Sequence, residues 1–192
     1  MKTILTLFVL LFSSSVVAED ISDFQIEGMS IGDSLLKHYD KNEILLFEKQ
    51  YSEFNNRRFY TINVNSKSNT YDNIMIRLEN DDDNFVIYNL VGEINYKQID
   101  INKCKKLKDT VINEISYLFK TIKPHSYDSI YDYMDDGKSI AYVTDFKLEG
   151  GKIRLWCRDW SKITENTRFF TDDFSVNITS STYLEWMKNN KQ

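Results

Sequence analysis

The stretch Thr144-Asp145-Phe146-Lys147-Leu148-Glu149-Gly150-Gly151-Lys152-Ile153-Arg154-Leu155-Trp156-Cys157 decides the fold, because two alternating runs flank a glycine pair. Such a pair favours a tight hairpin, since a type I′ turn needs positive φ at both central residues. A turn centred on the glycines puts the apolar residues on one face. The pairs expected there are Leu148 with Ile153, Phe146 with Leu155, and Thr144 with Cys157. Those expected on the opposite face are Glu149 with Lys152, Lys147 with Arg154, and Asp145 with Trp156.

Periodicity elsewhere predicts further strands and one long helix. Apolar residues recur at helical spacing over residues 102–120, and Pro124 follows, which cannot continue a helix. Short helices are expected near both ends, starting after Ser30 and over residues 41–47 and 182–189. Strands are expected over 24–27, 58–65, 71–80, 85–96 and 174–179, with a polar turn at 81–84. The prediction is an α+β fold in which the long helix packs on a predominantly antiparallel sheet.

Domain organisation is read from the order of these elements. The chain has no long linker or low-complexity stretch, which favours one compact α+β domain over residues 19–192. The order also suggests two halves, 19–98 and 99–192, each a helix followed by a meander of three or so strands. No residue-level repeat relates them, so one domain and two subdomains both stay open.

The first eighteen residues indicate export. Lys2 precedes an apolar run over residues 4–12, and small residues lead to Ala18. This pattern is typical of a secretory signal peptide cleaved after residue 18. The apolar run is about nine residues long, whereas a bilayer span needs roughly twenty. We therefore expect a periplasmic or secreted mature chain beginning at Glu19, with no membrane insertion after cleavage.

The predicted export determines how the two cysteines are interpreted. Cys104 lies on the apolar stripe of the long helix, and Cys157 lies on the apolar face of the hairpin. Paired thiols in an exported chain normally form a disulfide. Such a bond would close a loop of about 54 residues and contribute roughly 4 kcal/mol in the chain-entropy model. Two free buried thiols are the alternative.

The net charge of the chain argues against two classes of partner, nucleic acids and anionic membrane surfaces. The chain has 24 basic and 29 acidic residues and a net charge of -5, which becomes -6 when Lys2 is removed with the signal peptide. Nucleic acids and anionic membranes require a concentrated positive surface. We therefore expect no nucleic-acid partner. Nothing in the sequence calls for a cofactor.

Catalytic and metal-binding patterns are sparse. Gly28-Met29-Ser30-Ile31-Gly32 matches the GxSxG nucleophile pattern, but that elbow needs a parallel sheet and a late histidine, and the chain has only His38 and His125. Helix capping, with the Ser30 hydroxyl accepting the Asp33 N–H, explains the serine without catalysis. The oxygen-rich run 81–84 lacks the spacing of a calcium loop, and no close zinc-ligand pairs occur. We expect no catalytic residue and no metal site.

The candidate binding surface is an alternating row on the outward face of the hairpin, formed by Arg154, Trp156, Arg158 and Trp160. Guanidinium and indole groups bind planar ligands, sugars or a partner's aromatic residues. The alternative is that the row packs on itself, or beneath the segment with Tyr127, Tyr131 and Tyr133, as a second small core. Under the first alternative, alanine at Trp156 and Arg158 abolishes binding and spares stability.

The segment 20–36, Asp20-Ile21-Ser22-Asp23-Phe24-Gln25-Ile26-Glu27-Gly28-Met29-Ser30-Ile31-Gly32-Asp33-Ser34-Leu35-Leu36, resembles the mature start of a family of small exported proteins of unknown function from marine alphaproteobacteria. Cys104, and Cys157 within Cys157-Arg158-Asp159-Trp160-Ser161, fit the same family. The resemblance implies residence in the envelope or periplasm and supplies no catalytic residue. Gly28-Met29-Ser30 is also similar to the start of the small outer-membrane assembly lipoproteins of the BamE type.

Three classes of function are open. The first is a non-catalytic binding or protein-interaction module whose partner is an envelope protein or a small ligand. The second is an enzyme inhibitor built from two helix-and-meander halves, similar in architecture to beta-lactamase inhibitory proteins. The third is a serine hydrolase that uses Ser30.

Overall fold

The computed structural model describes residues 20–51, 57–96, 101–132 and 136–190. The predicted signal peptide, residues 1–18, lies outside this part of the chain. None of the described helices is both long enough and apolar enough to cross a bilayer.

One antiparallel sheet of eight strands organises the described chain, in the order β1-β2-β3-β4-β8-β7-β6-β5. The first half contributes β1 (Gln50–Tyr51), β2 (Phe59–Val64), β3 (Asn73–Glu79) and β4 (Ile87–Asn95). The second contributes β5 (His125–Ile130), β6 (Ile140–Leu148), β7 (Gly151–Asp159) and β8 (Asp173–Ser180). The predicted α+β class with a predominantly antiparallel sheet is confirmed. Each half supplies four strands rather than three, and the two meanders meet where β4 pairs with β8.

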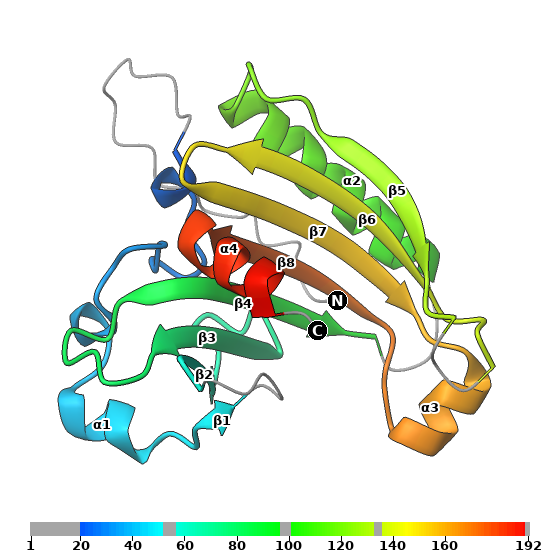
Figure 1. Ribbon diagram of the computed structural model, residues 1–192. Coiled ribbons are helices and arrows are strands. Elements are labelled where there is room, and N and C mark those ends of the chain that lie inside the picture. Colours follow the sequence, from blue (N-terminus) through cyan, green and yellow to red (C-terminus); the bar gives the residue numbers. More distant parts are fainter. Residues whose placement is uncertain (1–19, 52–56, 97–100, 133–135, 191–192) are drawn as a thin grey trace.

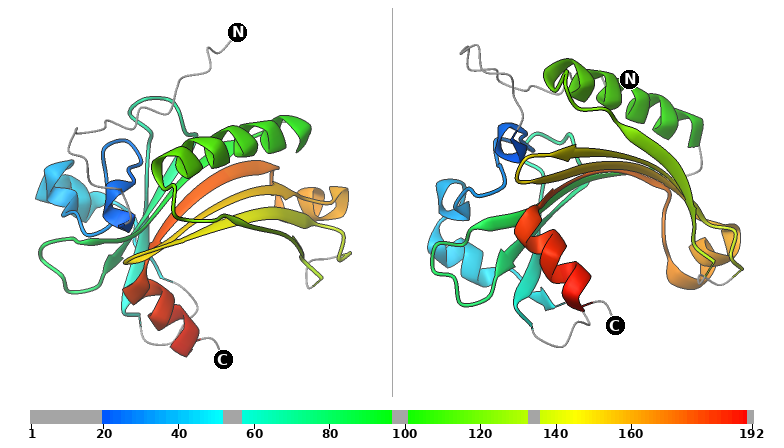
Figure 2. Two further views of the ribbon diagram at one scale, coloured as in Figure 1. Left: turned by 90° about the horizontal axis from the view of Figure 1, so that it is seen from above. Right: turned by 45° about the horizontal axis from the view of Figure 1, so that its top comes forward.

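Helices lie on both faces of this sheet. The long helix α2 (Ile101–Leu118) packs on β7 and β8, and the C-terminal helix α4 (Ser181–Asn190) packs on β4, β7 and β8. In Figure 2 the sheet arches beneath α2, and α4 lies on the opposite, hollow side. The smaller helices are α1 (Lys41–Leu46), α3 (Lys162–Arg168) and two 3-10 turns, Ile21–Asp23 and Leu35–Lys37. Figure 1 shows α3 beyond one end of the long strands. The hollow face is therefore only partly covered.

The main core lies between α2 and the sheet. Phe146, Ile153 and Leu155 are fully buried on the sheet side, and Ile115 is fully buried on the helix side. A disulfide joins Cys104 to Cys157 across this core, as the apolar positions of both residues predict. Burial of the helix stripe and the covalent link together hold α2 against β7.

The hairpin forms with a register two residues away from the predicted one. Leu148 pairs with Gly151 and Thr144 with Leu155, so the turn is centred on Glu149 and Gly150. Gly150 has φ +75°, and Glu149 is not among the residues with positive φ. The turn is therefore not type I′. The faces are unchanged by the shift, because a two-residue slip preserves the alternation of side chains.

Gly151 serves another purpose than the predicted one. It is the first residue of β7 and pairs with Ser180 of β8, and a Cβ atom here would overlap the backbone carbonyl oxygen of Thr179. A glycine inside a strand often marks such a close backbone approach. The second glycine is thus required for packing against β8 rather than for the turn.

Alanine at Gly151 should therefore lower the free energy of unfolding by about 1–3 kcal/mol, the usual cost of forcing atoms into a packed site. Urea denaturation measures this loss. Alanine at Gly28, where a Cβ meets nothing within 4 Å, is the control that carries only the strain of φ +81°. Equal losses in the two variants would show that Gly151 does not keep β8 close.

The predictions for the N-terminal segment were wrong in two places. Residues 24–27 do not form a strand, because Ile26 and Met29 exchange backbone hydrogen bonds of 3.0 Å around a turn with Glu27 and Gly28 at positive φ. The predicted cap at Ser30 is replaced by one at Ser34, whose hydroxyl accepts the Leu36 N–H at 3.3 Å. The Asp33 carboxylate instead accepts the Ser30 N–H. Positive-φ turn chemistry outweighed strand propensity here.

Candidate functional site

The hollow face of the sheet carries the candidate site. Side chains of one parity along β5, β6, β7, β8 and β4 meet there in cross-strand rows. One row is Tyr127, Val143, Trp156, Ser175 and Glu93, and the next is Ser129, Ala141, Arg158, Asp173 and Asn95. Farther along the face, Tyr183 and Trp186 of α4 cover Phe59. The rows on β5 to β8 stay open between α3 and α4.

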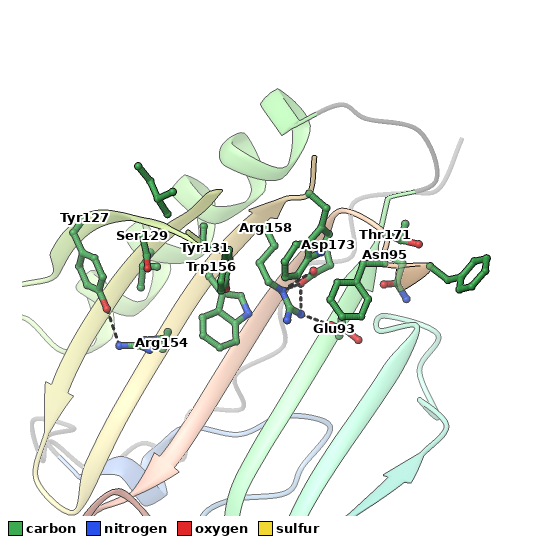
Figure 3. Close-up of a pocket in the computed structure, with 16 residues that line it drawn as sticks. Glu93, Asn95, Tyr127, Ser129, Tyr131, Arg154, Trp156, Arg158, Thr171 and Asp173 are labelled. Atoms are coloured by element: carbon green, nitrogen blue, oxygen red, sulfur yellow. Dashed lines mark hydrogen bonds and ion pairs between the residues drawn. The ribbon is translucent and has the colours of Figure 1, made fainter. Parts of the chain in front are cut away.

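This open part forms a groove of about 970 Å³. Figure 3 shows its polar and aromatic side chains standing side by side on neighbouring strands. The lining residues are Glu93, Asn95, Tyr127, Ser129, Ile130, Tyr131, Ala141, Val143, Arg154, Trp156, Arg158, Trp160, Phe169, Phe170, Thr171 and Asp173. The structure thus brings all four residues of the predicted Arg and Trp row to one groove.

Arg158 is held by two carboxylates from neighbouring strands. Its Nε lies 2.7 Å from Asp173 Oδ1, and its Nη2 lies 2.5 Å from Glu93 Oε1. The Asp173 side chain is only 2% exposed. Burial raises the pKa of Glu93, and the Arg158 charge offsets part of that effect. The charge of Arg158 on the floor of the groove is therefore largely neutralised by these two carboxylates, so Arg158 is not a free cation.

Arg154 has a similar but less buried arrangement. Its Nε and Nη2 donate to the two oxygens of Asp145 at 2.7 and 2.8 Å, and Nη2 also donates to the Tyr127 hydroxyl at 2.7 Å. Although burial favours the neutral acid, hydrogen bonding to and charge attraction by Arg154 lower the pKa of Asp145. Lys152 lies 3.6 Å from the same carboxylate. Both guanidinium groups are consequently fixed in place.

Trp156 stands between these two arginines. The guanidinium carbons lie 5.6 Å (Arg154) and 5.2 Å (Arg158) from its ring centroid, within cation–π range. Its indole N–H is buried and has no hydrogen-bond partner in the described chain. The row packs on itself, as one alternative held, and it also lines an open groove. Binding of a ligand or partner by the row, the other alternative, stays a prediction. Self-packing fixes the shape of the groove.

Trp160 differs from the other three members of the row. It is 6% exposed, stacks on Tyr131 at 5.0 Å and contacts Phe170 at 4.8 Å. Tyr133, the other tyrosine considered for this contact, lies outside the described residues. Trp160 supports the rim of the groove and presents little surface to a ligand.

An apolar rim borders this end of the groove. Phe169 is 88% exposed and has φ +58°, a left-handed conformation that is an outlier for a bulky side chain. Phe170 and Ile130 beside it are 38% and 59% exposed. Strain and exposure both cost free energy, and such outliers cluster at functional sites. This rim was not expected from the sequence, because α3, which precedes Phe169, was not predicted.

Asp172 sits behind the rim with an incomplete set of hydrogen bonds. The residue is 2% exposed, and its Oδ1 accepts the Trp160 N–H at 2.8 Å. Its Oδ2 is buried and has no hydrogen-bond partner in the described chain. Burial, with a smaller contribution from the charges of Asp159 and Glu165, raises the pKa of Asp172 to about 6.

The raised pKa predicts a pH-dependent stability. A carboxyl whose pKa is higher in the folded than in the unfolded state stabilises the fold below its unfolded value, and this contribution is lost as pH rises through about 6. In Asp172→Asn the side chain cannot ionise. Between pH 4 and pH 8, the free energy of unfolding of this variant should therefore rise by about 1–3 kcal/mol relative to that of the native protein. Denaturant titrations at several pH values test this, and parallel pH profiles would contradict it.

The structure also places the serine and the oxygen-rich run that the sequence raised as catalytic and metal-binding candidates. Ser30 does not line the groove, and no histidine of the described chain is hydrogen-bonded to it. The run 81–84 forms the predicted turn, in which the Asp82 carboxylate accepts the N–H groups of Asn84 and Val86, both at 2.9 Å. No group of three or more His, Cys, Asp and Glu side chains in the described chain could hold a metal ion.

Comparison of this chain with protein-family models, curated proteins and solved structures found no match. The functional argument therefore rests on the groove itself.

Proposed function

We propose that this chain is an exported, periplasmic or secreted, non-catalytic binding module that grips a protein partner in the groove on the hollow face. The observation that carries the proposal is an open groove whose walls are tryptophan, tyrosine and arginine side chains fixed by ion pairs. These three residue types are enriched among the residues that dominate protein–protein binding energies.

The rigidity of the groove supports the proposal. Arg154, Arg158 and Trp156 are ordered by one another and by buried carboxylates before any partner arrives. Ordering side chains on binding costs about 0.5–1.5 kcal/mol for each flexible residue, so a pre-ordered surface binds more tightly. The groove is also large and open, which suits a protruding loop or edge of a folded protein.

Enzyme inhibition is a second candidate, favoured by one observation. The two halves contribute β1 to β4 and β8 to β5 to a single sheet, so the strand order is mirrored about the β4–β8 junction. A continuous sheet of two meanders with a hollow face can enclose a convex enzyme surface. The measurement that separates this candidate from a plain binding module is the activity of a captured partner during titration with the chain.

Affinity capture from an envelope extract tests the proposed function with a matched pair of variants. Ser129→Arg fills the groove from β5, and Asn113→Arg places the same side chain on exposed α2, on the opposite face of the sheet. Quantitative mass spectrometry should find a protein that Asn113→Arg captures as well as the native chain and that Ser129→Arg captures at least about tenfold less, a loss of 1.4 kcal/mol or more. Equal capture by both variants would refute the proposal.

Export is tested separately by the mass and N-terminal sequence of the protein recovered from cells. A mature chain that starts at Glu19 is the expected result. Recovery only of a chain that still begins at Met1 would remove the exported part of the proposal and leave the groove argument intact.

A further inference from the structure

The two edge strands of the sheet differ in how well they are protected from pairing with another chain. β1 is two residues long, whereas β5 pairs with β6 in an unbroken register from His125 with Asp145 to Ile130 with Ile140. Proteins normally guard a free edge with short strands, lysine, proline, bulges or a covering segment. β5 contains no Lys, Arg or Pro, its register shows no bulge, and Asp128 is its one acidic residue. In the described part of the chain, β6 is the one strand paired with it, and Figure 1 shows it outermost.

The backbone groups that face the free edge can be identified. The Tyr131 N–H donates to the Ser139 carbonyl at 2.9 Å, so Tyr131 directs its backbone groups toward the β6 side. In an antiparallel ladder, alternate residues direct both their N–H and C=O to opposite neighbours. Ser126, Asp128 and Ile130 therefore offer their backbone groups outward, to a strand that the described chain does not supply.

The side chains along β5 differ on its two faces. Tyr127 and Ser129 line the groove, and Tyr127 is fixed there by Arg154. Asp128 points to the opposite face and is exposed; its side chain interacts electrostatically with Lys108 of α2 but makes no direct ion pair or hydrogen bond with another described residue. Opposite charges on directly facing residues stabilise a strand pair by about 0.2–1 kcal/mol.

We infer that β5 is a docking edge for an extended segment of the partner protein, which adds a ninth strand to the sheet. The segment's backbone hydrogen-bonds to Ser126, Asp128 and Ile130. Its side chains alternate between apolar or aromatic residues over the groove, beside Tyr127, and a Lys or Arg opposite Asp128. This mode of recognition is β-strand addition, in which main-chain bonds give affinity and alternate side chains give specificity. The inference rests on the proposed function, since it specifies how that partner is held.

A displayed library of random twelve-residue peptides, selected on the native chain, tests the inference. Enriched peptides should alternate aromatic or apolar residues with neighbouring positions that include Lys or Arg. Amide hydrogen exchange on the complex with a resynthesised peptide should show protection of Ser126, Asp128 and Ile130. No enrichment, or a bound peptide that leaves these amides unprotected, would overturn the inference.

Variants at Asp128 supply the matched comparison. Asp128→Pro removes an outward N–H and leaves the ladder to β6 unbroken, since proline is tolerated where a strand's N–H faces solvent. A folded Asp128→Pro chain should bind the selected peptides at least about tenfold more weakly, as expected for a lost main-chain bond and a lost charge pair. Asp128→Asn keeps the N–H and should bind about two- to fivefold more weakly. Circular dichroism and thermal melting check folding, and Ser126→Pro replaces Asp128→Pro if that chain does not fold.

The outcomes separate the inference from the proposed function. If the folded proline variant binds the peptides as well as the native chain, docking at β5 is refuted, and the capture experiment with Ser129→Arg still decides whether the groove binds a protein. Protection of the same three amides in the free chain, rising with its concentration, would show that a second copy rather than a partner occupies the edge. That result would also refute the inference.

Discussion

Replacing Cys104 and Cys157 together by alanine should lower the free energy of unfolding by about 4 kcal/mol. The bond closes a long loop, with a sequence separation of 53, and joins α2 to β7, an interior strand of the sheet. Both residues are buried, at 2% and 0% exposure, so the variant also loses packing at the helix–sheet interface. In a domain whose total stability is about 5–15 kcal/mol, this is a large fraction.

Equilibrium urea denaturation of the native chain and the double variant measures the effect. Reduction of the native chain should reproduce most of the loss, because it removes the same constraint without changing the residues. A change below about 1 kcal/mol in both experiments would show that noncovalent packing alone holds α2 on the sheet.

Replacing Arg158 by alanine should cost about 3–5 kcal/mol, because removal of one partner leaves buried charges uncompensated. Without the guanidinium, Asp173 on β8 and Glu93 on the adjacent β4, which lie diagonally to each other in the register, lose the cation that both contact. Arg154→Ala is the matched control. Its carboxylate partner Asp145 still has Lys152 at 3.6 Å, and Arg154 is somewhat more exposed than Arg158, so the loss should be smaller.

Neutralising the two carboxylates that Arg158→Ala leaves unpaired tests whether uncompensated charge causes the loss of stability. Adding Glu93→Gln and Asp173→Asn to a chain with Arg158→Met should restore much of the stability lost in Arg158→Ala, since a neutral cluster has no unpaired charge. If Arg158→Ala is as stable as Arg154→Ala, the ion-pair network does not support the groove. A large loss would also mean that alanine at Arg158 is a poor probe of binding, because it alters the fold itself.

The sequence was sufficient for the features that depend on local periodicity. The stripe of α2 and the alternation of β7 predicted the α+β class and the buried faces, and together with the predicted export they predicted the disulfide. The hairpin register was wrong by two residues because Gly151 is required by a contact with Thr179 of β8, which is distant in the sequence. Local turn chemistry cannot show such a contact.

The site was only partly predictable for the same reason. The alternation of Arg154, Trp156 and Arg158 placed these residues on one face, but their carboxylate partners come from β4, β6 and β8. β5 was missed because an edge strand with one polar face shows no apolar alternation. Phe169 was missed because its exposure depends on where α3 ends. Long-range pairing, which the sequence pattern does not encode locally, assembles the groove.

Photocrosslinking in cells tests the binding claim most directly. p-Benzoylphenylalanine is incorporated at Phe169, on the rim of the groove, or at Tyr117, a 70% exposed aromatic residue on α2 across the sheet. We expect the chain with the probe at Phe169 to form one dominant crosslink to another protein, and the chain with the probe at Tyr117 to form none to that protein. A partner captured from Tyr117 but not from Phe169, or no crosslink from Phe169, would contradict the claim that the hollow face is the binding surface.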